Sequence, residues 1–149
     1  MWFGLVGGVA WGQTDALLVV ENDAGEVLLR LELTPPTWIL RWNHSVTGIV
    51  VSDYYAVTGG AMMLTDSHTP AFDAGLGHIV GRGRLEPAPN HGYWILDIDE
   101  PVPGNRYALR VGSPAVDHRI VHNGATYSLS DLASGERVYI YLADLGDYP

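Results

Sequence analysis

The feature that most constrains the fold is an alternation of apolar and polar residues in short segments separated by turns. In residues 26–33, for example, valine and leucine occupy every second position, and charged residues fill most of the others. A period of two is typical of a half-buried β strand, because successive side chains point to opposite faces. The same period recurs in residues 37–44, 49–57, 93–99, 105–111 and 137–142. The pattern predicts an all-β fold, either a single-domain β-sandwich or a distorted barrel of about ten mainly antiparallel strands.

The chain length of 149 residues is that of one domain. We assign residues 16–149 to a single all-β domain and residues 1–15 to an N-terminal apolar arm or to the remnant of a signal or anchor. Helix is expected in less than about a tenth of the residues, as one turn that is capped by Ser130 and ended by Gly135. No apolar run approaches the roughly 18 residues of a membrane-spanning helix, so none is expected in this chain.

Charge and cysteine content exclude several classes of function. The net charge is −9 at pH 7, all basic residues other than histidine are arginines, and there is no cysteine. An acidic protein repels phosphate backbones, so we expect no nucleic-acid partner. The absence of cysteine rules out a thiolate metal site, a cysteine nucleophile and a disulfide framework.

Four ionisable residues occupy positions where the alternation expects apolar side chains on the inner faces of three consecutive strands. They are His44, Asp53, Asp66 and His68. A buried charge is costly unless it is paired. We therefore predict that Asp53 or Asp66 lies within hydrogen-bond reach of His44.

Three interpretations of these residues stay open. The first is a structural histidine–carboxylate network that fixes strand register. The second is a ligand site for a small solute or a divalent cation, with His44, Asp66 and His68 as the candidate metal ligands. The third is a catalytic site in which His44 acts as a base together with Asp53 or Asp66; Ser45 has the opposite strand parity and is not its nucleophile.

The glycine-rich segment from Asp66 to Arg84 forms a predicted loop of about twenty residues, a length that usually carries function. The amides around Gly75 and Gly77 are suited to an anion-binding nest. Arg82 and Arg84 are suited to bidentate contacts with a carboxylate. The alternative is a loop whose glycines only permit tight turns.

The run R-W-N-H-S-V, the acid in V-V-S-D-Y-Y and the loop A-F-D-A-G-L-G resemble the bacterial family known as domain of unknown function 1850. The resemblance covers residues 16 to 142. The family pattern usually reads H-S-V-E and F-G-A-G, and here Thr47 and Asp73 stand at the differing positions. Genes of that family lie beside TRAP transporters of the TAXI type, which move organic anions with a secreted solute-binding protein.

The resemblance implies a periplasmic or otherwise extracytoplasmic protein, exported or membrane-associated. We expect a non-enzymatic accessory domain of a TAXI-type TRAP transport system, with the transporter's membrane subunit or its solute-binding protein as the partner. It would bind a small organic anion, a cation or a transporter component, with no cofactor unless a divalent cation is the ligand. The alternative is a small hydrolase or isomerase that acts on the transported organic anion with His44 as base.

Overall fold

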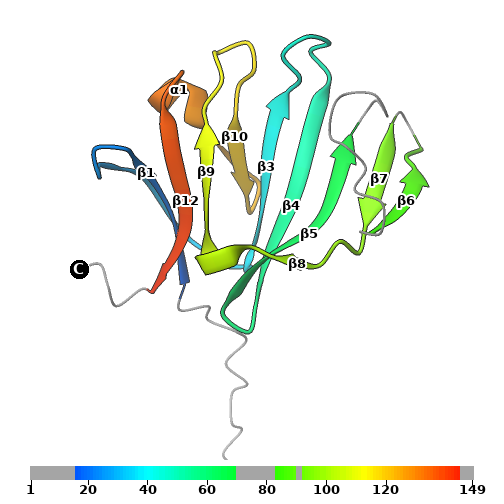
Figure 1. Ribbon diagram of the computed structural model, residues 1–149, viewed down its shortest axis with the longest axis horizontal. Helices are drawn as coiled ribbons and strands as arrows, with labels where there is room; N and C mark the ends of the chain where they lie inside the picture. The colour runs from blue at the N-terminus through cyan, green and yellow to red at the C-terminus, as the bar shows by residue number, and fades with distance from the viewer. Residues whose placement is uncertain (1–15, 70–82, 90–91, 145–149) are drawn as a thin grey trace, which may run out of the picture.

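Two antiparallel sheets pack face to face in the computed structural model, which describes residues 16–69, 83–89 and 92–144 (Figure 1). The small sheet has the strand order β2 (Val27–Glu32), β1 (Ala16–Asn22), β12 (Arg137–Asp144) and β9 (Arg106–Arg110). The large sheet has the order β11 (Ala125–Ser128), β10 (Arg119–His122), β3 (Thr37–Asn43), β4 (Val50–Thr58), β5 (Ala61–Thr69), β7 (Tyr93–Leu96) and β6 (Arg84–Pro87), and β8 (Glu100–Pro101) pairs with β5. The predicted all-β sandwich is confirmed, and the sheets do not close into a barrel.

The inner faces of the two sheets supply one hydrophobic core, as the alternation predicts. Trp38 of β3 stacks on Tyr55 of β4 with ring centroids 5.2 Å apart, and Tyr55 stacks on Tyr107 of β9 at 5.4 Å. This aromatic column joins the large sheet to the small one, and each such pair contributes about 0.5–1.5 kcal/mol beyond its buried area. The side chains that pack around this column include Leu18, Val20, Leu31, Leu33, Leu40, Ile120, Val138 and Ile140.

A β-bulge interrupts the pairing of β4 with β5. Tyr55 pairs with Leu64, but the preceding residue of β4, Tyr54, pairs with Asp66, so Thr65 is an extra residue. The hydroxyl of Thr65 donates a hydrogen bond to the carbonyl oxygen of Tyr54 at 3.1 Å. Because side chains alternate between faces, one extra residue moves every following side chain of β5 to the opposite face.

The bulge overturns the prediction that Asp66 and His68 lie on the inner face. Both instead lie on the outer face of the large sheet. Ser67 takes the inner position opposite Asp53, and its hydroxyl donates to a carboxylate oxygen of Asp53 at 2.7 Å. The predicted inner position of Asp53 is confirmed by its pairing with Leu40, a core residue of β3.

Two element boundaries differ from the prediction for local reasons. Strand β7 ends at Leu96 instead of residue 99, since Asp97 and Asp99 have φ values of 56° and 42°, outside the extended region. The short helix α1 (Leu129–Ala133) is capped by Ser128, whose hydroxyl accepts from the amide of Asp131 at 3.2 Å, and not by Ser130. The only other helical segment in the described ranges is a 3-10 turn, Pro103–Asn105.

None of the helices in the described part of the chain has the length and apolar character needed to cross a membrane. The predicted arm of residues 1–15, the predicted nest around Gly75 and Gly77, and the predicted carboxylate ligand Arg82 lie outside the described residues.

Candidate functional site

Three segments meet at one end of the sandwich: the turn after β3, the loop between β9 and β10, and the helix α1 (Figure 1). A cavity of about 360 Å³ lies at this end. That volume falls in the lower part of the range for small-molecule sites, roughly 300–1,000 Å³. The cavity is lined by Trp42, His44, Ser45, Arg110, Val111, Gly112, Val116 and His118.

His44 begins the tight turn between β3 and β4 and also caps it. Its amide donates to the carbonyl oxygen of Ile49 at 2.7 Å, and its own carbonyl oxygen accepts from Gly48 at 2.9 Å. Gly48 has a φ of 70°, a left-handed conformation that favours glycine. The ring nitrogen Nδ1 of His44 accepts from the amides of Val46 and Thr47, both at 3.3 Å. The H-S-V-T-G run is therefore a turn built around the imidazole.

The bonds to Nδ1 decide what the His44 ring offers to a ligand. A nitrogen that accepts a hydrogen bond carries no proton, so in the neutral ring the proton is on Nε2. The Nε2–H of His44 is then a hydrogen-bond donor at the cavity, and the basic nitrogen is occupied by backbone amides. This arrangement suits a ligand with acceptor atoms and opposes a role for His44 as a general base.

A second histidine, His118, lines the same cavity. Its Nδ1 accepts from the amide of Gly112 at 2.8 Å. Burial lowers the pKa of His118, and the nearby carboxylate of Asp117 opposes the shift to a smaller extent. The neutral ring therefore also carries its proton on Nε2. Neither Nε2 atom has a hydrogen-bond partner within the residues that the structure describes.

The β9–β10 loop holds His118 against the end of β3. Asn43 fastens the loop by donating from its amide to the carbonyl oxygen of Val116 at 2.7 Å and from Nδ2 to that of Ala115 at 3.1 Å. A Cβ added at Gly112 would lie 2.6 Å from the side chain of Val116, so only glycine fits there. The ring of Trp42 lies 5.7 Å from that of His118 and forms one wall of the cavity.

Ser130 ties the helix α1 to the same loop. Its side chain is buried, and its hydroxyl donates to the carbonyl oxygen of Gly112 at 2.9 Å and accepts from the amide of His118 at 3.0 Å. The carbonyl oxygen of His118 accepts from the amides of Leu129 and Ser130. No sequence pattern singles out His118, because only the folded loop brings it to the cavity that His44 lines.

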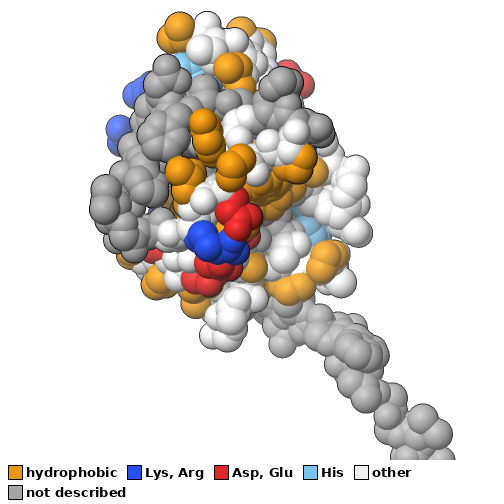
Figure 2. All heavy atoms as spheres, turned by 90° about the vertical axis from the view of Figure 1, so that its right-hand side faces the viewer, with side chains coloured by type: hydrophobic (Ala, Val, Ile, Leu, Met, Phe, Trp, Pro, Cys, Tyr) orange, Lys and Arg blue, Asp and Glu red, His pale blue; other side chains and the backbone are white. Residues whose placement is uncertain are grey.

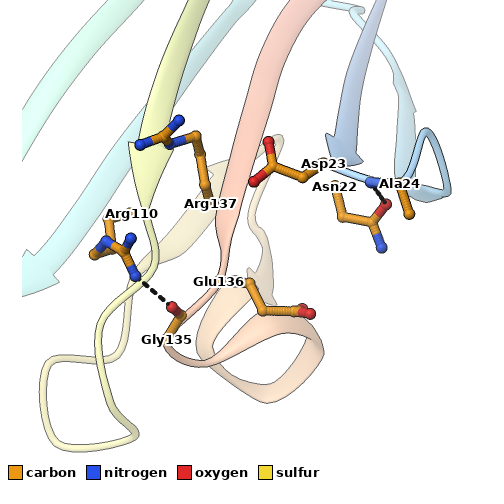
Figure 3. A pocket seen from close by; sticks show the side chains of 7 residues that line it. All are labelled: Asn22, Asp23, Ala24, Arg110, Gly135, Glu136 and Arg137. Carbon is orange, nitrogen blue, oxygen red and sulfur yellow. Dashed lines mark hydrogen bonds between the residues drawn. The ribbon is translucent and has the colours of Figure 1, made fainter.

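Arg110 adds a positive charge at the edge of the cavity. Its Nη1 donates to the carbonyl oxygen of Gly135 at 2.8 Å (Figure 3). Arg110 also borders a second hollow of about 340 Å³ with Arg137, Asp23 and Glu136, in which both signs of charge are present. In the described ranges, no carboxylate lies within ion-pair distance of Arg110. Its positive charge is therefore not balanced by an ion pair in this part of the chain.

The cavity beside His44 is rich in residues that donate hydrogen bonds through N–H groups. Two histidines and one arginine line it, and none of its lining residues is acidic. Neutral and charged N–H donors of this kind bind carboxylates. Metal binding through Nε2 is opposed by the proton that each ring carries there. No cluster of three or more His, Asp or Glu side chains suited to a metal exists among the described residues.

The predicted pairing of His44 with an acid is wrong in the described structure. Asp53 pairs with Leu40, four residues before His44, which is a distance of about 13 Å along a strand. Its carboxylate is bonded to Ser67, and burial raises its pKa. Asp66 accepts from the amide of Asp97 at 3.1 Å on the other face of the sheet.

The other predicted site residues also lie away from the cavity. His68 pairs with Trp94 across β5 and β7, and their ring centroids are 4.8 Å apart. Arg84 forms ion pairs with Glu86 and, at 3.3 Å, with Asp97, at the edge of the large sheet. Figure 2 shows basic and acidic side chains side by side on this side of the molecule. The candidate metal ligands His44, Asp66 and His68 are therefore not gathered into one site.

Comparison with protein families matches residues 39–129 to a domain of unknown function, DUF1850. Comparison with curated proteins and with solved structures finds no match. The matched region runs from β3 to α1 and includes Trp42, His44, Arg110 and His118. It covers more than half of the chain, and the chain therefore belongs to the DUF1850 family.

Proposed function

We propose that this domain binds a small organic anion, without catalysing a reaction, in the cavity between His44 and His118. The observation that carries the proposal is the pair of imidazoles whose Nδ1 atoms are both occupied by backbone amides. Each ring then directs a donor, not a base, to the ligand. Arg110 supplies the positive charge, and the wall formed by Trp42 suits the apolar part of an organic anion.

The proposed setting is a TAXI-type TRAP transport system outside the cytoplasm. Family membership supports this setting, because genes of the family lie beside such transporters. The domain would act as an accessory protein that presents an organic anion to the transporter's membrane subunit or to its solute-binding protein. Organic anions are also the ligand class that the donor groups of the cavity fit best.

The binding proposal is tested by isothermal titration calorimetry with a panel of short mono- and dicarboxylates. His44→Asn is the most informative variant, because its side-chain oxygen can still accept from Val46 and Thr47 while the Nε2–H is lost. We expect His44→Asn and His118→Asn each to weaken binding by about 1–3 kcal/mol, the cost of one hydrogen bond to a charged group. His68→Asn, which removes an imidazole from the other face of the large sheet, is the control and should bind normally.

Two results would contradict the binding proposal. One is the lack of saturable binding for every carboxylate of the panel by a folded protein. The other is an unchanged affinity in both cavity variants. The transport setting is tested separately, by cell fractionation and by uptake of the bound anion in a strain that lacks the gene. A cytoplasmic protein, or unchanged uptake, would reject the setting without affecting the binding result.

A further inference from the structure

A groove crosses the outer face of the large sheet, apart from the His44 cavity and from the hollow beside Arg137. Its floor is a lateral row of directly paired residues from β10, β3, β4 and β5: Val121 pairs with Ile39, Ile39 with Tyr54, and Tyr54 with Asp66. All four line a hollow of about 450 Å³. Three interstrand spacings separate the ends of the row, which gives it a length of about 14 Å.

The chemistry of the groove changes in one direction along the row. Val121 and Ile39 form an apolar end, the ring of Tyr54 lies in the middle, and the carboxylate of Asp66 lies at the other end. Tyr54 is braced from the side by Trp94, with ring centroids 5.4 Å apart. None of the residues that line this groove is basic.

The carboxylate of Asp66 is held by a hydrogen bond but has no cationic partner among the described residues. One of its carboxylate oxygens accepts from the amide of Asp97 at 3.1 Å, which fixes the orientation of the side chain. No arginine or histidine of the described ranges forms an ion pair with it. A half-buried carboxylate with a fixed orientation and no cationic partner is suited to receive a positive charge from a ligand.

The β-bulge is the reason that the carboxylate reaches this groove. Without the bulge, Thr65 would pair with Tyr54, and the alternation would direct Asp66 into the core. Bulges often occur beside functional sites, where they redirect a side chain. Thr65 also lines the groove and stabilises the bulge through its bond to the carbonyl oxygen of Tyr54.

We infer that this groove binds a primary ammonium ion with an apolar tail. The ammonium group donates to the carboxylate of Asp66 and lies near the ring of Tyr54, which attracts a cation through its π face. The tail lies over Ile39 and Val121. The charge of −9 further favours a cationic ligand over an anionic one at a site without basic residues.

The experiment compares four probes of similar size by isothermal titration calorimetry and two-dimensional NMR at neutral pH. They are hexylamine, hexanol, cadaverine and hexanoate. Hexylamine should bind, and hexanol, which lacks the charge, should bind about tenfold more weakly or not at all. Cadaverine should also bind more weakly than hexylamine, because its second ammonium would lie at the apolar end of the row. Hexanoate should not shift the resonances of groove residues.

Variants separate the groove from general charge effects. Asp66→Asn retains an acceptor for the amide of Asp97 and removes the charge, so it should weaken hexylamine binding by about tenfold or more. Tyr54→Leu should weaken binding several-fold, while Tyr54→Phe should retain it. Asp23→Asn is the matched control, since it removes one negative charge from the turn between β1 and β2 and should leave the affinity unchanged.

The inference is overturned if hexanol or cadaverine binds as tightly as hexylamine, or if a folded Asp66→Asn variant retains full affinity. It is also overturned if hexylamine produces no shifts at the groove. If Asp66→Asn does not fold, the two Tyr54 variants and the probe series still decide the question. The result is independent of the anion proposal, because His44→Asn should not alter hexylamine binding.

Discussion

Replacing Ser130 by alanine tests whether the buried hydroxyl holds the candidate site together. Ser130 is 3% exposed and connects two backbone groups of the β9–β10 loop. Its hydroxyl accepts from the amide of His118 at 3.0 Å and donates to the carbonyl oxygen of Gly112 at 2.9 Å. Alanine removes both bonds at once and has no atom that replaces them.

The expected loss of stability follows from the two backbone groups that lose their hydrogen bond to Ser130. The amide of His118 loses its partner, and a buried group without a partner costs about 1–3 kcal/mol. The carbonyl oxygen of Gly112 retains only a longer bond of 3.4 Å from Ser134. Alanine offsets part of the loss, by about 0.5 kcal/mol, because it favours helix more than serine does. With about 0.5–1.5 kcal/mol for the weakened hydrogen bond at the carbonyl oxygen of Gly112, the two losses less this gain lower the free energy of unfolding by about 1–4 kcal/mol.

Urea unfolding followed by tryptophan fluorescence measures the change. With a slope of about 2 kcal/mol per molar urea, the midpoint should fall by about 0.5–2 M. Ser134→Ala is the control, since this exposed serine donates to the same carbonyl oxygen and its loss should change stability by less than about 0.5 kcal/mol. Equal effects of the two variants, or a loss below about 0.5 kcal/mol for Ser130→Ala, would refute the reasoning.

Three further predictions concern residues of the cavity and the core. Gly112→Ala places a Cβ 2.6 Å from the side chain of Val116 and should cost about 1–3 kcal/mol in urea unfolding; an unchanged midpoint would contradict this packing. Burial raises the pKa of Asp53, so Asp53→Asn, which can still accept from Ser67, should raise stability at neutral pH. That gain should vanish below pH 3.8, where the carboxyl is protonated in both states, and a gain that persists in acid would exclude this explanation. Burial lowers the pKa of His118 below 6.5, so the unfolded chain binds the proton first and stability should decline as pH falls below 6.5; thermal unfolding of His118→Gln should show a weaker decline.

The fold was predictable because burial on a strand is a local pattern. Trp38, Leu40 and Tyr55 are buried at the positions that a period of two assigns to the core. The turns at Gly48 and Gly135 have the positive φ values that favour glycine. Each of these features depends on a few consecutive residues, so the sequence contains enough information to locate them.

The candidate site was only half predictable, because half of it depends on long-range contacts. His44 stood out as a histidine that continues an apolar strand face, and it does line the cavity. His118 lines the same cavity as His44 because the β9–β10 loop folds against Asn43, and no local signal in the loop predicts this arrangement. The role of Ser130 was misassigned for the same reason, since its partners lie 12 and 18 residues away in the chain.

The extra residue in β5 explains why the predicted inner position of Asp66 is wrong. It also explains how the buried carboxylate of Asp53 obtains a hydrogen-bond donor. If the pairing of Tyr55 with Leu64 continued without a bulge, Asp53 would lie directly opposite Asp66 on the inner face. Two carboxylates at such positions have Cβ atoms about 5 Å apart and repel each other, and here they would also be buried. The bulge places Ser67 opposite Asp53, so a hydroxyl donor replaces a second negative charge. The same shift carries Asp66 to the outer groove, where water or a cationic ligand can solvate it.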